Sequence, residues 1–195
     1  MITEDRIRHI RLFDGTGPVW RALHHLEARL READIPYVII GGVALNTYGY
    51  PYEAADVAIV IREPDREQFL KQHLGNGYES VSGSLRHLTD LESGVSVFFC
   101  IAGRLAGRPG KNEIIRFPDP ADAPVRSDSR VVSLPLLIEL KLARGFIRDL
   151  ADVVELIRYN KLTERFAGEF DSSVRSAYLE CCEQATDEWY LGPQL

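Results

Sequence analysis

The chain has 195 residues, of which 45% are hydrophobic and 27% are charged, and these proportions exclude a disordered or low-complexity polypeptide. Its net charge of -6 excludes a global basic field for nucleic acid. The three cysteines, two of them adjacent at 181 and 182, form no disulfide framework and favour a reducing compartment. Residues 1–12 are too charged for a secretory signal, and no apolar run approaches the ~18 residues that span a bilayer. We therefore expect a cytoplasmic protein without a membrane partner.

The hydrophobic pattern of residues 18–74 predicts alternating helices and buried strands. Residues 18–34 form an amphipathic helix, because Leu23, Leu26 and Leu30 fall on one face. We then expect a strand at 37–40, a short helix at 43–48, a strand at 57–61 and a helix at 65–74. The strand at 57–61 is apolar on both faces, which is typical of a central strand.

The remainder divides into a strand-rich stretch and a helical C-terminal part. Strands are expected at 77–81, 85–88, 95–101 and 113–117, and helices at 134–144, 147–159 and 171–189. The fold class that follows is α+β. We expect a small mixed β-sheet core flanked by helices over residues 1–133, and a helical subdomain over 134–195 that packs on this core.

Two glycines, Gly41 and Gly42, stand where a buried strand passes directly into a helix. Glycine lets a backbone approach a phosphate closely, and the first turn of a helix offers unpaired N–H groups, although a tight strand-to-helix turn needs the same residues. Asp56 lies beside the next strand. Carboxylates at i and i+2 on a strand point the same way and can hold Mg²⁺ between them, but position i+2 here is Ala58.

This segment resembles the nucleotidyltransferase superfamily, which has the DNA polymerase β-like fold, and is most similar to its small bacterial AbiEii-type branch. The family pattern is a strand, Gly-Gly, a short helix, Gly, a turn with Arg and Thr, and then Asp-hydrophobic-Asp. This chain has Ile-Gly-Gly-Val-Ala-Leu-Asn over 40–46, Gly-Tyr-Pro over 49–51 and Asp-Val-Ala-Ile-Val over 56–60. The resemblance implies a nucleotidyltransferase-like α/β core.

Further motifs follow in the family's order. The strand that supplies a third carboxylate corresponds to Val-Ser-Val-Phe-Phe over 95–99. Next come Phe-Pro-Asp-Pro over 117–120, a Leu-Pro-Leu-Leu-Ile-Glu-Leu-Lys-Leu-Ala helix over 134–143, and Arg-Asp-Leu-Ala-Asp-Val over 148–153. Together these motifs cover about residues 35–158.

The departures from the family pattern decide the functional expectation. The second acid is Ala58, the third is Phe98, and the Arg and Thr of the turn are Tyr52 and Ala54. Loss of two of three acids removes most of the charge that positions Mg²⁺, and phosphoryl transfer depends on that positioning. We therefore predict a pseudo-nucleotidyltransferase in which Asp56 is vestigial, acting as a binding or scaffold subunit with no cofactor and no metal site.

The same resemblance assigns roles to three further positions in the C-terminal helices. It implies that Lys141 faces nucleotide phosphates together with Gly41 and Gly42. Asp149 and Asp152, at i and i+3, share one helix face. We expect them to pair with Lys141 or with Arg148, and thereby to hold the helical part against the sheet. This is a structural role for the Arg-Asp motif rather than a catalytic one.

Two alternatives stay open. An active enzyme would use Mg²⁺ and a nucleoside triphosphate to modify RNA or protein in a toxin-like reaction, with replacement acids among Glu53, Asp90 and Glu92. A nucleotide sensor would bind without transfer, and needs Gly41, Gly42 and Lys141 to face a cleft that is not blocked by a bulky side chain.

The remaining patterns bear on partners and on the core. We expect a protein partner or a homo-oligomer, and the candidate interface consists of Ile10, Leu12, Phe13, Trp20 and the segment 189–191. The basic residues of 104–116 are a weaker candidate for RNA. Phe98 and Phe99 are predicted to be core residues. The pair at 181 and 182 is expected to give one buried thiol and one at the edge.

Overall fold

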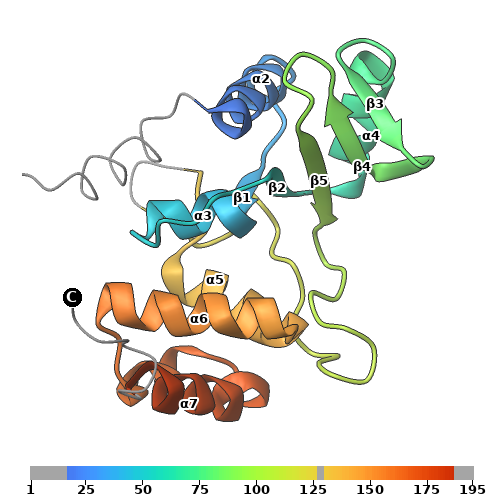
Figure 1. Ribbon diagram of the computed structural model, residues 1–195. Coiled ribbons are helices and arrows are strands. Elements are labelled where there is room, and N and C mark those ends of the chain that lie inside the picture. The colour runs from blue at the N-terminus through green and yellow to red at the C-terminus, as the bar shows by residue number, and fades with distance from the viewer. Residues whose placement is uncertain (1–16, 127–129, 187–195) are drawn as a thin grey trace, which may run out of the picture.

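The computed structural model describes residues 17–126 and 130–186, and it confirms the α+β class. Figure 1 shows a mixed sheet with helices on it, followed by a helical C-terminal part. The strands are β1 (Val38–Ile40), β2 (Asp56–Ile61), β3 (Tyr78–Val81), β4 (Ser84–Asp90) and β5 (Ser96–Ile101). The helices are α2 (Pro18–Glu32), α3 (Gly41–Thr47), α4 (Glu63–His73), α5 (Leu134–Arg144), α6 (Ile147–Asn160), the 3-10 helix η1 (Glu164–Glu169) and α7 (Ser172–Thr186).

The five strands form one sheet in the order β1-β2-β5-β4-β3. β2 and β5 are parallel neighbours, and every other pair is antiparallel. The parallel pair places Asp56 opposite Ser96 and Ala58 opposite Phe98. Because side chains alternate along a strand, Asp56, Ala58 and Phe98 all point to one side of the sheet.

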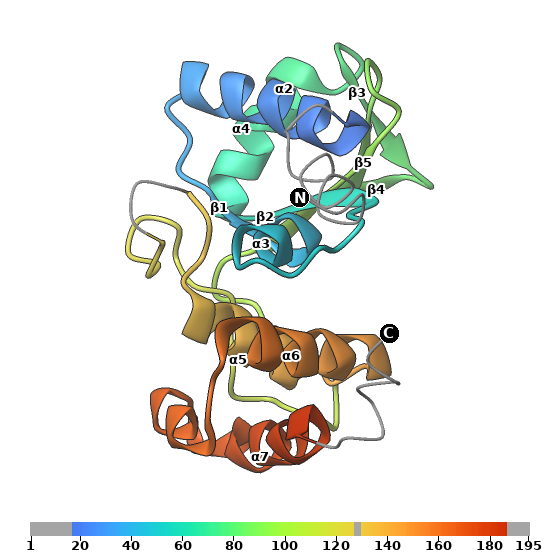
Figure 2. The same ribbon diagram turned by 60° about the vertical axis from the view of Figure 1, so that its left-hand side comes forward.

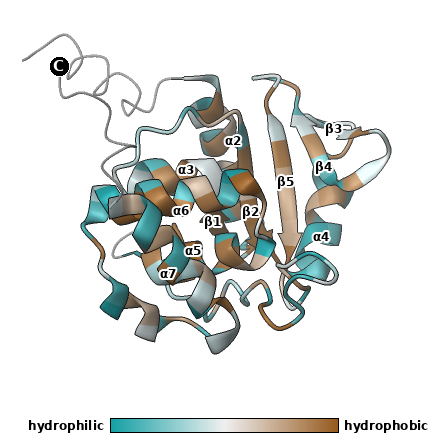
Figure 3. Cartoon of the chain, turned by 60° about the horizontal axis from the view of Figure 1, so that its bottom comes forward, coloured by the Kyte–Doolittle hydropathy of each residue, from teal (hydrophilic) through white to brown (hydrophobic). Residues whose placement is uncertain are grey.

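The other side of the sheet carries the main hydrophobic core. Val57, Ile59 and Val97 are fully buried there, and Phe69 of α4 packs edge-on against Phe99 with ring centroids 5.3 Å apart. Figure 2 shows α2 and α4 on this side of the sheet and α5 and α6 on the opposite side. In Figure 3 the hydrophobic colour follows β2 and β5, whereas the outer turns of the helices are hydrophilic.

The C-terminal helices α5, α6 and α7 pack on one another. Figures 1 and 2 both place α6 between α7 and the sheet. Tyr178 of α7 is fully buried and donates a hydrogen bond to the carbonyl of Thr163. Cys181 and Cys182 are both buried and both free, so the expectation of one edge thiol is wrong. Consecutive positions can both be buried because α7 packs against α6, η1 and α5, and is therefore covered on more than one side.

The expected strand at 113–117 does not form. Only an isolated bridge joins Leu105 to Arg116, and the side chain of Asn112 accepts hydrogen bonds from the backbone N–H groups of Ile114 and Ile115. An Asn side chain that bonds the following backbone offers a local alternative to a sheet ladder, which explains why an apolar stretch here remains a loop.

Two parts of the predicted interface lie outside the described part of the chain. They are Ile10, Leu12 and Phe13, and the aromatic segment 189–191. Among the described residues, no helix is long and apolar enough to cross a membrane.

Candidate functional site

A cleft of about 290 Å³ lies between the sheet face that carries Asp56 and the helices α5 and α6. The structure brings to this cleft every residue that the family resemblance singles out for a metal, a phosphate or an ion pair, whereas the candidate replacement acids lie elsewhere. Its wall at the sheet contains Gly41, Gly42, Asp56, Ala58 and Phe98, and its wall at the helices contains Lys141, Arg148, Asp149 and Asp152. Residues from five elements, separated by up to about one hundred positions in the sequence, therefore meet at one place.

The floor of the cleft is formed by Ala58 and Phe98, which are cross-strand neighbours. Phe98 is only partly buried and stacks on His87 of β4, with ring centroids 4.1 Å apart and an interplanar angle of 19°. The expectation that Phe98 belongs to the core is therefore wrong, whereas Phe99 is in the core with 3% exposure. Neighbouring strand residues point to opposite faces, and only one of these two faces is closed by α4.

Asp56 is half-buried and is the first residue of β2. Burial raises the pKa of its carboxyl group, while the positive charge of Arg148 and, more weakly, that of Arg144 opposes this rise. Loss of solvent penalises a carboxylate unless a cation or hydrogen-bond donors compensate it. The guanidinium groups of Arg148 and Arg144 thus partly stabilise the ionised form of Asp56.

The two glycines are explained by close packing. Gly41 has φ +71°, and a Cβ atom there would lie 3.2 Å from the methyl group of Ala58. At Gly42 an added Cβ would come within 2.9 Å of the Tyr52 ring and 3.0 Å of Ala54. The structure therefore requires glycine at both positions for the turn into α3.

A buried ion network joins α5 to α6. Lys141 Nζ donates a hydrogen bond of 2.7 Å to Asp152 Oδ2 and lies 3.6 Å from Asp149 Oδ1. Arg144 Nε lies 3.4 Å from Asp149 Oδ2. The predicted pairing of both aspartates with Lys141 is confirmed, but Arg148 is not the alternative partner, because its guanidinium lies 5.4 Å from the ring of Tyr52 instead.

The candidate replacement acids do not join Asp56. Asp90 faces the opposite side of the sheet, where it accepts a hydrogen bond from Ser93 and lies 3.2 Å from His25 Nδ1. Glu92 lies 3.3 Å from the other ring nitrogen of His25, and Glu53 is exposed. Among residues 17–126 and 130–186, no group of three or more His, Cys, Asp or Glu side chains is placed to hold a metal ion.

No protein-family model matches this chain, and no curated protein is significantly similar to it.

The residues that sequence reasoning missed at the cleft and beside it include Tyr52, His87 and Arg144. In the sequence Tyr52 stands out only as the replacement for a family arginine, yet in the structure its ring packs against Gly42 and Arg148. His87 carried no sequence signal, since its role depends on the register that places it beside Phe98. Arg144 is the last residue of α5, and its distance of three residues from Lys141 indicates the same helix face.

Proposed function

We propose that this chain is a pseudo-nucleotidyltransferase, a protein with the nucleotidyltransferase fold that has lost metal-dependent transfer and works by binding. The observation that carries the proposal is the neighbourhood of Asp56. The three positions that the family pattern assigns to metal-binding acids meet on one face of two adjacent strands, but they carry Asp56, Ala58 and Phe98.

The placement of these positions supports the resemblance itself. A two-metal site needs carboxylates that converge from neighbouring strands, and the parallel register of β2 and β5 brings Ala58 directly beside Phe98. The glycine pair precedes them at the mouth of the same cleft. A chance match of short motifs would not be expected to bring these separated segments to one cleft.

The remaining charges of the cleft support the loss of transfer. Two of its three acids, Asp149 and Asp152, are within 4 Å of Lys141, and Asp149 is also close to Arg144. A carboxylate already compensated by an ammonium group is a poor ligand for Mg²⁺, because the cation would have to displace that group. Asp56 is left as the single carboxylate that the described strands contribute to the lining of the cleft.

The turn between α5 and α6 supports a role in binding other macromolecules. Ile147 is 89% exposed, and Phe146 is 44% exposed beside the guanidinium groups of Arg108 and Arg144, at 4.2 and 5.7 Å from its ring. An apolar side chain this exposed at the rim of a cleft is typical of a contact site. We propose that this rim contacts a protein partner or a second copy of the chain.

Incubation with each labelled nucleoside triphosphate, Mg²⁺ or Mn²⁺, total RNA and a protein extract tests the proposal. The folded protein should transfer no label above the level of the Asp56→Asn variant. Transfer that disappears in Asp56→Asn would show an active enzyme and overturn the proposal.

Light scattering during gel filtration, with Ile147→Asp as the variant and Lys71→Asp as the exposed control, tests self-association at the rim.

Nucleotide binding without transfer is the second candidate, and the cationic wall of the cleft favours it. Lys141, Arg144 and Arg148 line the cleft together with the glycine pair, and Phe98 lies against His87 so that a cavity remains. A thermal shift with ATP that is lost in Arg148→Gln, but kept in Arg116→Gln, would support this function. No shift with any of the four nucleoside triphosphates would contradict it.

A further inference from the structure

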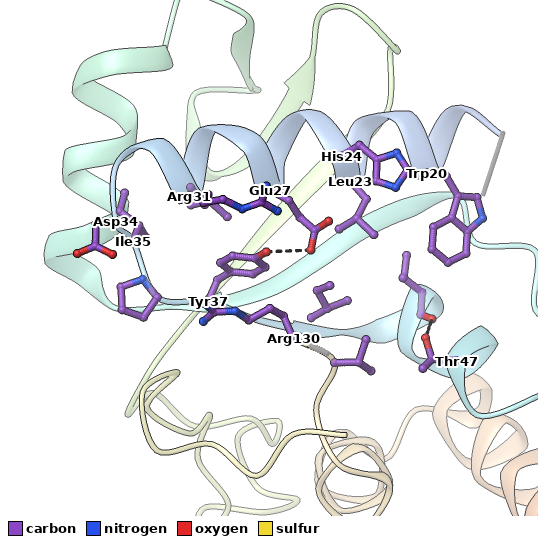
Figure 4. Close-up of a pocket in the computed structure, with 15 residues that line it drawn as sticks. Trp20, Leu23, His24, Glu27, Arg31, Asp34, Ile35, Tyr37, Thr47 and Arg130 are labelled. Atoms are coloured by element: carbon purple, nitrogen blue, oxygen red, sulfur yellow. Dashed lines mark hydrogen bonds between the residues drawn. The ribbon is translucent and has the colours of Figure 1, made fainter. Parts of the chain in front are cut away.

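A second and larger cavity, of about 620 Å³, lies on the other side of β1 and α3 from the cleft. Helix α2 forms its roof, and Figure 4 shows the side chains that project into it. Ile39 and Val43 line this cavity, whereas their neighbours Ile40 and Gly42 line the cleft. The two hollows are therefore separate and share β1 and α3 as a common wall.

The interior of this cavity combines an apolar surface with one fixed polar pair. Leu23, Ile39 and Val43 are buried residues that contribute the apolar surface. The hydroxyl group of Tyr37 donates a hydrogen bond of 2.8 Å to Glu27 Oε1, as Figure 4 shows. Burial, and then the bond to Glu27, raises the pKa of Tyr37, so its hydroxyl group stays a donor and holds the Glu27 carboxylate in place.

Both signs of charge line the same cavity without neutralising each other. Glu27 and Asp34 supply two carboxylates, and Arg31 and Arg130 supply two guanidinium groups. Among the residues that the structure describes, none of these acids lies within 4 Å of either arginine, while Arg130 lies over the ring of Tyr37 at 5.4 Å from its centroid. A bound molecule therefore meets separate acidic and basic groups.

We propose that this cavity is a binding site for a small zwitterion with an apolar side chain, of the free amino acid or dipeptide class. The ammonium group would bind the free oxygen of Glu27, and the carboxylate would bind the guanidinium groups of Arg31 and Arg130. Arg31, Asp34 and Arg130 are exposed and Glu27 is half-buried. A zwitterion can bond the acidic and the basic groups of this lining at once, whereas a simple anion or a simple cation can bond only one of the two sets. The apolar side chain would lie against Leu23 and Val43, beneath Trp20.

This site is additional to the proposed function of the cleft and does not depend on it. Because β1 and α3 form walls of both hollows, a ligand held against Val43 lies one residue from Gly42 in the chain.

Binding of L-leucine and of the dipeptide Leu-Leu to the full chain tests the proposal. Calorimetry gives the affinity, and the fluorescence of Trp20 in a Trp189→Phe background reports the location, since the chain has two tryptophans. We expect saturable binding of at least one of the two, with a change in Trp20 emission. N-acetyl-L-leucine lacks the ammonium charge and L-leucinamide lacks the carboxylate, so each should bind at least about tenfold more weakly.

The variants assign the two charged contacts. Glu27→Gln and Arg130→Gln should each weaken binding by about tenfold or more, whereas Arg116→Gln, an exposed arginine away from the cavity, should leave it unchanged. Circular dichroism establishes that each variant is folded. Absence of binding for both probes overturns the proposal, as does equal binding of the parent and its two derivatives. A stronger affinity for N-acetyl-L-leucine would show a plain anion site and would also overturn it.

Discussion

The ion network between α5 and α6 makes a quantitative prediction for the Lys141→Met variant. Methionine keeps the length and the apolar stem of lysine but removes the ammonium group. The side chains of Lys141, Asp149 and Asp152 are only 8%, 6% and 6% exposed, so solvent cannot replace the lost contact. Arg144 still compensates Asp149 at 3.4 Å, whereas Asp152 loses its 2.7 Å partner.

The expected cost follows from that uncompensated carboxylate. Removing one member of a buried ion pair costs about 3–5 kcal/mol of unfolding free energy. Urea denaturation followed by circular dichroism should show a midpoint lowered by roughly 1–2 M, given a slope of about 2–3 kcal/mol/M. The double variant Lys141→Met/Asp152→Leu should recover most of the loss, because it buries no unpaired charge. Lys71→Met, at an exposed position of α4, should change the free energy by less than about 0.5 kcal/mol.

A loss below about 1 kcal/mol in Lys141→Met would refute this reasoning. It would mean that Asp152 finds water or another donor, and that the network does not hold α5 against α6. A double variant as unstable as Lys141→Met alone would attribute the cost to lost packing instead of charge.

Three further predictions concern the cleft and the core. Because burial raises the pKa of Asp56, its ionisation opposes folding, so Asp56→Asn should be more stable than the wild type at pH 7, and this advantage should vanish as the pH falls below the ordinary carboxyl pKa of about 4. Burial lowers the pKa of His73, so the unfolded chain takes up its proton first; the wild type should lose stability below about pH 6.5, and His73→Gln should lose less over the same range. Gly42→Ala should cost about 1–3 kcal/mol, because its Cβ would meet the Tyr52 ring at 2.9 Å, whereas Gly168→Ala, with nothing within 4 Å, should be close to neutral; equal values in thermal denaturation would contradict the packing argument.

The sequence by itself predicts most of the elements of this protein and several residues of its cleft. The apolar stripe of α2, the double-sided apolar character of β2 and the strand-to-helix transition at Gly41 are local patterns, and a local pattern fixes the element that carries it. The alternation along β2 also fixes that Asp56 and Ala58 share a face.

Only the tertiary structure decides which elements cover each face of the sheet. Phe98 and Phe99 are equivalent in sequence, yet only the face of Phe99 is covered by α4, and Phe98 is left in the cleft beside His87. The same alternation sends Asp90 to the far face, where it pairs with His25 and cannot reach Asp56. The separation of acids from arginines beneath α2 likewise depends on how that helix lies over β1. Such contacts join residues that are far apart in the chain, and a local hydrophobic pattern gives no information on which distant residues will meet.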